Sequence, residues 1–451
     1  MKKIICLITL VVLIPSLVLA DGMVIPPVDP YIPLDENAQL AAINYQDGLE
    51  KMIISVNFDM KDYDEAAWIF PVPAEPNSVV IDIINNFPEL SGDDVIRKAR
   101  SDVDGIIYAT TLTQIYPLFL LFPTRYMAGV SRYDKMAAIE GLGGTIEGVT
   151  VYEHIEKGGI STDIVTSSTA EALYNFLLKW KGIRLPVGSL PVFDNYIGKD
   201  YTFVVSYITK PEEVVRGGYG YPYGRQPGIF ITFPTDRIYY PLIPTSVYGS
   251  KTIPIKLYVM DYVTPDLYSE INSYTSTNYY IQRHGSKYDF EYFYGNMDVN
   301  DMKFTKVEIN VPSKYFKEDL WIDQVAPPQV EYATGIYYSI SKYPFITGII
   351  LVLVISSISG AISGFFIFKD YKKFALIGLA NVFTIIGLAI ALTFTKTKKK
   401  MEESVKKRMK ELGFTPIITD EKKFLFLILF SILFLIIAFL IGYLIKLPLS
   451  F

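Results

Sequence analysis

Uncharged apolar runs lie at the two ends of this 451-residue chain, and the long stretch between them is polar and rich in tyrosine. Three runs near the C-terminus, Pro344–Phe368, 374–395 and 424–445, each hold 22 to 25 residues without a charge. About 20 apolar residues in helical geometry cross the hydrocarbon core of a bilayer. The pattern therefore predicts a C-terminal anchor of three transmembrane helices.

The first twenty residues have a pattern typical of a secretory signal peptide. Lys2 and Lys3 precede an apolar stretch that extends to residue 19, and the small residue Ala20 then offers a cleavage position. An uncleaved anchor helix is the alternative. Both versions predict that residues 21–343 form a domain outside the cytoplasm. Cys6, the single cysteine, lies within this signal, so the mature chain keeps no thiol for a disulfide or a nucleophile.

The three C-terminal runs contain no Asp, Glu, Lys, Arg or His, although pumps and coupled transporters usually place such groups at membrane depth. Gly360 and Gly364 form a small-xxx-small step, as do Ala438 and Gly442, and such steps let helices approach closely. We expect them to pack the helices against each other or against a partner. The polar residues of the runs include Ser356, Ser357, Ser359, Ser363, Asn381, Thr384 and Ser431.

The charges between the runs raise a conflict over topology. If residues 21–343 lie outside and every run spans, the loop 369–373 is cytoplasmic with three Lys/Arg, while the basic loop 396–423 is outside with ten. This contradicts the tendency of positive charge to stay in the cytoplasm. We predict three full spans, with the basic loop lying on the outer leaflet. The alternative is that residues 344–395 cross once, with 356–364 as a re-entrant segment.

The alternation of apolar residues indicates a β-hairpin near the start of the exported domain. Residues 40–45 and 52–58 are predicted strands, and Asp47 and Gly48 between them favour the positive φ angles of a tight turn. Further strands are predicted at 66–73, 160–166, 201–208, 228–233, 253–260 and 304–311.

One helix is predicted inside the exported domain. Ser168 and Glu171 have the spacing of a capping box, and apolar residues at helical intervals follow up to residue 181.

Pro71 and Pro73, in the predicted strand 66–73, indicate a strand end or edge because proline donates no ladder hydrogen bond. Few helices among many strands predict an α+β fold class: a strand-rich extracytoplasmic domain followed by the helical anchor, with a division of the domain into two lobes near 141–144 as one version of it.

The formal net charge of −5 hides an asymmetry along the chain. Residues 21–343 hold 26 Lys+Arg against 41 Asp+Glu, whereas residues 344–451 hold 14 against 6. An acidic exported domain repels nucleic-acid phosphates, so no nucleic-acid partner is expected. The expected partners are membrane lipid and an envelope or membrane protein.

The sequence offers little support for catalysis or for a cofactor. His154 and His284 are the only histidines, so a three-histidine metal site is impossible, and no nucleophile elbow or phosphate-binding loop occurs. Two acidic clusters lack the order of a calcium loop, so we expect solvated charge rather than a metal site. These clusters are Asp59, Asp62, Asp64 and Glu65, and Asp298, Asn300 and Asp301.

A glycine- and tyrosine-rich segment, 218–224, is the candidate contact site. Its spacing is wrong for a dinucleotide-binding turn, and Pro222 lies where the helix of such a turn would begin. Tyr219, Tyr221 and Tyr223 are predicted to contact a ligand or partner, because a tyrosine ring offers apolar area and one hydroxyl at low entropy cost. No catalytic, cofactor-binding or metal residue is assigned.

Parts of the chain resemble the exported proteins grouped as domain of unknown function 2330. The resemblance rests on residues 21–27, on 39–56 with its Asp47-Gly48 turn, and most specifically on Ala67-Trp68-Ile69-Phe70-Pro71-Val72-Pro73. It continues through 149–208 and 231–242. It implies a signal-bearing envelope protein and brings no known reaction.

Three functional hypotheses follow from the sequence. The first is a membrane-anchored, non-enzymatic cell-envelope protein whose exported domain binds a surface component or an assembly partner; 32 of the 34 tyrosines lie in that domain. The second is a membrane-anchored extracytoplasmic hydrolase that uses carboxylates and one histidine. The third is a structural subunit of a membrane complex, in which the C-terminal helices matter more than the exported domain.

Overall fold

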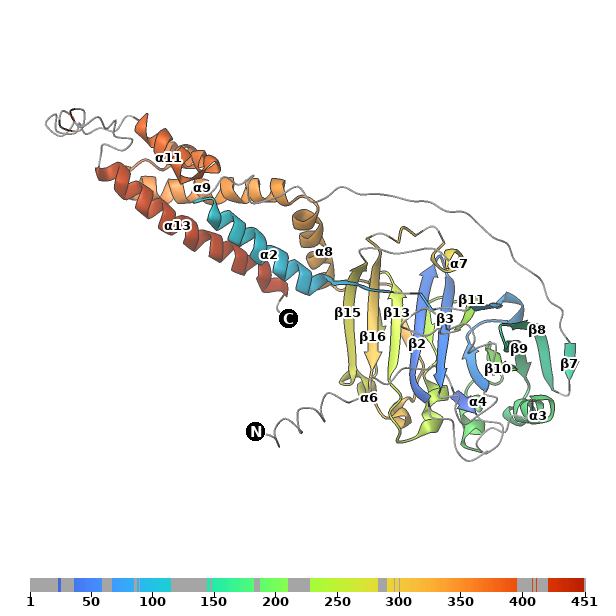
Figure 1. Ribbon diagram of the computed structural model, residues 1–451. Coiled ribbons are helices and arrows are strands. Elements are labelled where there is room, and N and C mark those ends of the chain that lie inside the picture. Colours follow the sequence, from blue (N-terminus) through green and yellow to red (C-terminus); the bar gives the residue numbers. More distant parts are fainter. Residues whose placement is uncertain are drawn as a thin grey trace, which may run out of the picture. The chain divides into compact units, whose positions relative to one another are not determined.

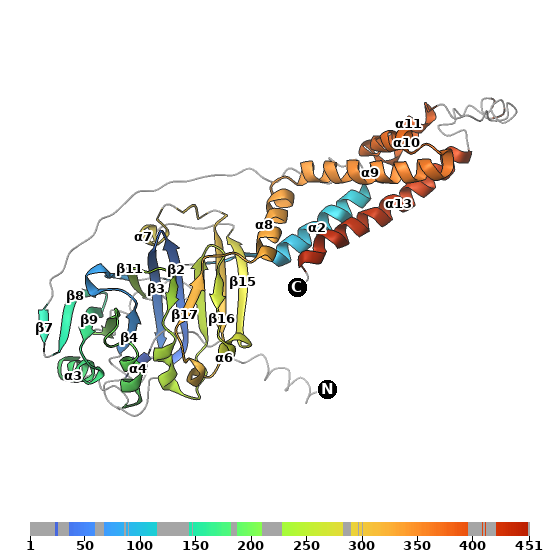
Figure 2. The same ribbon diagram turned by 180° about the vertical axis from the view of Figure 1, so that it is seen from behind.

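The computed structural model of the chain divides into two compact units (Figures 1 and 2). A strand-rich unit comprises Met1–Asp93 and Arg132–Pro327, and a helical unit comprises Asp94–Ser131 and Pro328–Phe451. The predicted signal peptide lies outside the described residues. The structure describes residues 23–25, 36–58, 67–84, 87–88, 90–114, 144–146, 148–181, 187–209, 228–282, 290–295, 297–299, 301–395, 408, 411 and 421–449.

The larger sheet of the strand-rich unit has eight strands. Its order is β5 (Val80–Ile84), β11 (Gly228–Pro234), β3 (Leu49–Phe58), β2 (Glu36–Gln46), β13 (Ile255–Met260), β16 (Lys303–Ile309), β15 (Thr275–Gln282) and β6 (Gly92–Asp94). The pair β2 and β13 is parallel, whereas β2 and β3 form the predicted antiparallel hairpin. Asp47 and Gly48 at its turn have φ angles of 53° and 79°, which confirms the predicted tight turn.

The smaller sheet has six strands. Its order is β1 (Met23–Ile25), β4 (Ala67–Val72), β10 (Thr202–Ile208), β9 (Ile160–Ser167), β8 (Val149–Lys157) and β7 (Gly144–Ile146). β4 lies between β1 and β10, but β1 pairs only with Ala67–Ile69. Pro71 is therefore beyond the reach of β1, which explains how a strand inside the sheet tolerates a residue without an N–H group.

The two sheets share one hydrophobic core. Along β4, Trp68 and Phe70 join the same buried cluster as Met52 and Ile54 of β3, while Ile69 belongs to a second cluster on the opposite face. This second cluster lies under α3 (Ala170–Lys181) and α4 (Leu190–Asp194). Because both faces of β4 are covered, the strand is an unbroken apolar run without polar alternation.

Short segments complete the strand-rich unit. β12 (Ile238–Tyr240), β17 (Leu320–Asp323) and β14 (Thr264–Asp266) form a third, three-stranded sheet. The predicted helix at 169–181 is α3, but its N-terminal cap is one residue later than expected, since Thr169 Oγ1 accepts the hydrogen bond from the Ala172 N–H at 3.0 Å. The remaining short helices are η2 (Pro76–Ser78), η4 (Val187–Ser189), η5 (Ile243–Tyr248), α6 (Ser269–Asn272), α7 (Glu291–Tyr294) and η6 (Ser313–Tyr315).

The helical unit contains the three predicted apolar segments, each long and apolar enough to cross a membrane. The first is α9 (Pro344–Phe368) and the third is α13 (Glu421–Lys446), followed by η8 (Leu447–Leu449). The second is broken into α10 (Tyr371–Gly378), η7 (Leu379–Phe383) and α11 (Thr384–Thr393). The mixed α+β class and the apolar C-terminal helices are thus confirmed.

Two further helices belong to this unit, although their sequences were assigned to the exported domain. α2 (Val95–Leu112) and α8 (Pro328–Ser341) group with the C-terminal helices. Val103, Ile106 and Ile107 of α2 share a buried cluster with Phe430 and Phe434 of α13, among other residues. By these contacts α2 groups with the C-terminal helices rather than with the strands.

Glycines bring α9 and α10 into close contact, as the small-xxx-small step of α9 predicts. A Cβ atom on Gly360 would collide with the Phe374 carbonyl oxygen, and one on Gly378 would collide with that of Ser356. Gly364 likewise faces Phe374, whose side chain is fully packed. Ala438 is buried, and Gly442 lies against Ile107 of α2, where a Cβ would be 2.9 Å from Cγ1.

Replacing Gly360 by Val is expected to destabilise the helical unit by about 1–3 kcal/mol, because the added side chain meets backbone that cannot yield locally. Thermal unfolding of the detergent-solubilised protein measures the effect. Gly335→Ala in α8 is the matched control, since nothing lies within 4 Å of the added Cβ. Equal melting temperatures for the two variants would contradict the close α9–α10 contact.

Candidate functional site

The predicted contact tyrosines Tyr219, Tyr221 and Tyr223 lie outside the described residues, as does His284. The acidic cluster at 59–65 is also outside them, whereas Asp298 and Asp301 are described. Among the described residues, no group of three His, Cys, Asp or Glu side chains is arranged to hold a metal ion. Two other clusters of described side chains are therefore the candidates, one around His154 and one around Arg237.

His154 pairs with a carboxylate on the neighbouring strand. Its Nδ1 lies 2.5 Å from Asp163 Oδ1, and the two residues are register partners in β8 and β9. Asp163 is buried while the His154 side chain is 43% exposed, so the carboxylate orients the imidazole toward the surface. A carboxylate that orients a histidine is also part of a catalytic triad, but no contact of His154 with a nucleophilic hydroxyl is seen among the described residues.

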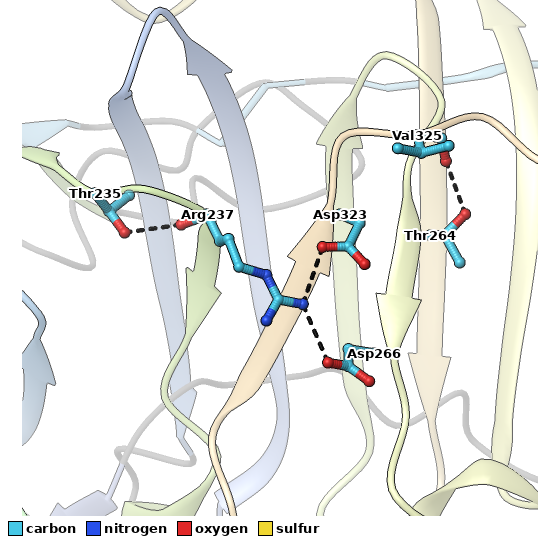
Figure 3. Close-up of polar contacts among 6 residues, drawn as sticks. All are labelled: Thr235, Arg237, Thr264, Asp266, Asp323 and Val325. Atoms are coloured by element: carbon cyan, nitrogen blue, oxygen red, sulfur yellow. Dashed lines mark hydrogen bonds and ion pairs between the residues drawn. The ribbon is translucent and has the colours of Figure 1, made fainter.

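A second cluster of charged and aromatic side chains lies on the three-stranded sheet. Arg237, which precedes β12, contacts the last residue of each of the other two strands (Figure 3). Its Nη2 atom is 3.1 Å from Asp266 Oδ2 and 3.0 Å from Asp323 Oδ1. The single guanidinium thus ties the three strands together. Tyr45 lies nearby, since its hydroxyl donates to the backbone carbonyl oxygen of Thr235 at 3.0 Å, and we call Tyr45, Arg237, Asp266, Trp321 and Asp323 the Arg237 patch.

Aromatic rings pack against the Arg237 patch on its buried side. The guanidinium carbon of Arg237 lies 6.0 Å from the ring centroid of Trp321, at the outer limit of a cation–π contact. Trp321 packs on Tyr239 with ring centroids 5.0 Å apart, and Tyr239 meets Tyr201 at 6.1 Å. Arg237, Trp321, Tyr45 and Tyr201 are all partly exposed, whereas Tyr239 is fully buried.

Tyr239 connects this surface to two carboxylates beneath it. Its backbone N–H donates to Glu50 Oε2 at 2.7 Å, and its hydroxyl donates to Asp319 Oδ2 at 2.9 Å. Glu50 has no exposed surface, and burial raises its pKa well above the ordinary value despite the hydrogen bond from Tyr239. Burial in the core therefore favours the protonated form of the Glu50 side chain.

Asp319 is the most heavily hydrogen-bonded carboxylate of the described residues. It accepts from the hydroxyl groups of Tyr196 and Tyr239 and from the backbone N–H groups of Leu242 and Ile243, at distances of 2.9–3.0 Å. Burial raises its pKa, and the four donors oppose that rise. The carboxylate holds β12 and the start of η5 in place, so its role is structural support of the Tyr239 ring.

The tyrosine hydroxyl groups around Asp319 are neutral at physiological pH. Burial, and next the nearby Asp319, raise the pKa of Tyr201 to about 12, and the pKa of Tyr196 is raised by the same two causes. Neutral phenols cannot act as bases near pH 7 but do donate hydrogen bonds. The arrangement therefore suits binding rather than proton transfer: a rigid platform of Trp, Tyr and Arg, the residue types that dominate interface energetics.

Comparisons with known proteins do not add to this site. No family model and no curated protein matches the chain. Among solved structures, a mutated baculovirus P35 after caspase cleavage is similar, with 10% identity, a TM-score of 0.23, and coverage of 64% of this chain and 100% of that one. A similarity with so low a TM-score carries no argument about fold or function. The resemblance to domain of unknown function 2330 stays a prediction.

Replacing Glu50 by Gln is expected to flatten the pH dependence of stability. The folded-state pKa is raised above 4.5, so the native state holds a proton that the unfolded state releases, and stability falls as pH rises from about 4.5 to the folded-state pKa. Glu50→Gln should therefore unfold at a higher temperature than the wild type near pH 8 and at a similar one near pH 4. The exposed Glu171→Gln variant is the control; identical profiles for both variants would refute the raised pKa.

Proposed function

We propose that the chain is a membrane-anchored, non-enzymatic cell-envelope protein whose strand-rich unit lies outside the cytoplasm and binds a surface component or an assembly partner. Three helices long and apolar enough to span a membrane support the anchoring. The predicted signal peptide and the acidic balance of residues 21–343 support the location.

The Arg237 patch is the single observation that carries the binding proposal. It offers partly exposed indole, phenol and guanidinium groups on a backbone fixed by two ion pairs and by the Asp319 hydrogen bonds. Pre-ordered aromatic and arginine side chains lose little entropy on binding, which is why they dominate interface hot spots. A partner would contact Trp321 and Arg237 directly, while Tyr239 keeps the indole in place.

The binding proposal is tested by a photo-reactive residue at Gln324, an exposed position next to Asp323. We expect irradiation of living cells to give a discrete crosslinked product that is lost in the Trp321→Ala, Arg237→Ala double variant. The same photo-reactive residue at the exposed position Tyr292 is the control. No product at Gln324, or one that survives the double variant, would contradict binding at the Arg237 patch.

A membrane-anchored hydrolase is the second candidate, because Asp163 orients His154 at the surface. The binding proposal predicts that His154→Ala changes neither the melting temperature of the protein by more than a few degrees nor the crosslinked product. Thermal unfolding and crosslinking measure these two effects, and a complementation assay in cells that lack the protein measures function. Loss of complementation with an intact fold would favour the hydrolase.

A further inference from the structure

One end of the helical unit is marked by polar contacts between helices. The Ser341 hydroxyl, at the end of α8, donates to Asp102 Oδ2 of α2 at 2.6 Å. The last residue of α13, Lys446, lies 2.5 Å from Asp104 Oδ1 of α2. The start of α9, the end of α13 and the charged half of α2 are therefore together, and we call this the near end.

The opposite end is marked by stacked phenylalanines. The rings of Phe368, at the end of α9, and Phe374, near the start of α10, are 4.3 Å apart and almost parallel. Phe426, near the start of α13, lies 5.0 Å from Phe374. This far end therefore holds the end of α9, the start of α10 and the start of α13, so α9 and α13 run the full length of the unit in opposite directions.

The broken middle segment begins and ends at the far end. Lys423 Nζ, in the first turn of α13, donates to the carbonyl oxygens of Thr393 and Thr395 at 3.4 and 2.9 Å. The end of α11 thus lies beside the start of α13, at the same end as Phe374. A straight second span would place residues 393–395 at the near end instead.

The middle segment reaches only half-way along α9. Gly378 at the end of α10 packs on Ser356, and Asn381 Nδ2 donates to Ser356 Oγ at 3.2 Å. Ser356 is the central residue of Pro344–Phe368. At 1.5 Å per residue, α10 and α11 are about 12 and 15 Å long, which matches half of a hydrocarbon core of about 30 Å.

The reversal occurs at η7, where the chain leaves regular helical geometry. Thr384 has a φ of 76°, a conformation that β-branched residues rarely adopt. Asn381 and Thr384 are both buried at this point. Irregular backbone at membrane depth persists only where protein surrounds it, and the contact with the middle of α9 provides those surroundings.

We propose that the helical unit crosses the membrane twice, through α9 and α13, and that α10–η7–α11 is a re-entrant hairpin inserted from the far side. Its outward-facing apolar surface, partnered by lipid chains, includes the exposed residues Leu376, Phe383, Ile386, Ile390 and Phe394. The proposal rests on the anchoring of the protein in a membrane, but not on which side is outside.

Two crossings resolve the charge conflict in the sequence. The end of α11 and the start of α13 lie together at the far end, so the two-crossing proposal puts the basic loop 396–423 that joins them on the far side of the membrane. The first residues of α2 and α8 follow residues of the strand-rich unit directly in the chain, and both helices have contacts at the near end of the helical unit. With the strand-rich unit outside, the basic loop 396–423 becomes cytoplasmic, as the positive-inside tendency requires.

α2 supports the position of the near-side boundary. It runs antiparallel to α13, because Asp104 pairs with Lys446 and Ile107 packs on Gly442. Its charged residues end at Asp104, and residues 105–112 carry no charge. From Lys446 toward the far end, the charge-free half of α2 therefore lies alongside the apolar part of α13, at membrane depth.

Single-cysteine labelling in a Cys6→Ser background tests the proposal on the full-length protein. Three positions are compared with a membrane-impermeant maleimide, in intact and in permeabilised cells: Ser276 in the strand-rich unit, Ser404 in the basic loop and Ser450 after α13. We expect S276C and S450C to be labelled in intact cells and S404C only after permeabilisation.

The two-crossing arrangement requires S450C on the same side of the membrane as S276C and S404C on the opposite side. Any other distribution of the three positions overturns it. Three crossings would place S404C on the side of S276C and S450C on the opposite side. If S276C itself is protected in intact cells and S404C is labelled, the extracytoplasmic location fails while the two-crossing arrangement still holds. Each variant must retain the melting temperature of the Cys6→Ser parent to be counted.

Discussion

The close approach of α9 and α10 is the contact on which the helical unit depends. A bilayer offers no hydrogen-bond partner to an interrupted backbone, so a break in an apolar segment survives only against another protein surface. Gly360, Gly364 and Gly378 remove the side chains that would keep the two helices apart. The break at η7 can then rest on the centre of α9, and the reversal of the chain follows from that support.

The stability of the strand-rich unit depends on the burial of apolar side chains together with a few buried polar groups that must find hydrogen-bond partners. Two sheets share a core into which Trp68, Phe70, Met52 and Ile54 project. At the edge of this core, Tyr239 links two buried carboxyl groups: its backbone N–H donates to Glu50 and its hydroxyl donates to Asp319. An enclosed carboxylate costs stability unless its partners are in place, so this network specifies one arrangement of β12 and η5.

Local signals in the sequence predicted the local structure well. The turn at Asp47 and Gly48, the boundaries of α9 and the helix at 169–181 all follow from short-range patterns. The re-entrant alternative for residues 344–395 was placed at 356–364, which lie in the regular helix α9, whereas the chain reverses at 379–383. Hydropathy gives the length and composition of a segment, but its direction depends on glycine contacts between helices that are not visible in the sequence. α2 was missed because its first half is charged and its partners lie more than 200 residues away, although its charge-free second half was a usable signal.

The Arg237 patch could not be predicted for a related reason. Arg237, Asp266 and Trp321 are far apart in the sequence and only the three-stranded sheet brings them together. The tyrosine-rich segment 218–224 stood out in the sequence by composition, yet composition does not show which rings are held rigidly. Tyr239 stands beside Tyr240 and Pro241 without any motif that would single it out.

The packing of α2 also imposes an order on biosynthesis. Ribosomes produce residues 95–112 long before α9 and α13 exist, so the apolar face formed by Val103, Ile106 and Ile107 must wait for its partners. Until the last helix has been inserted, that face is open to chaperones or to wrong associations. A chain shortened before residue 344 would keep α2 covered only by α8, without α9 and α13, so residues 21–343 are not a detachable module.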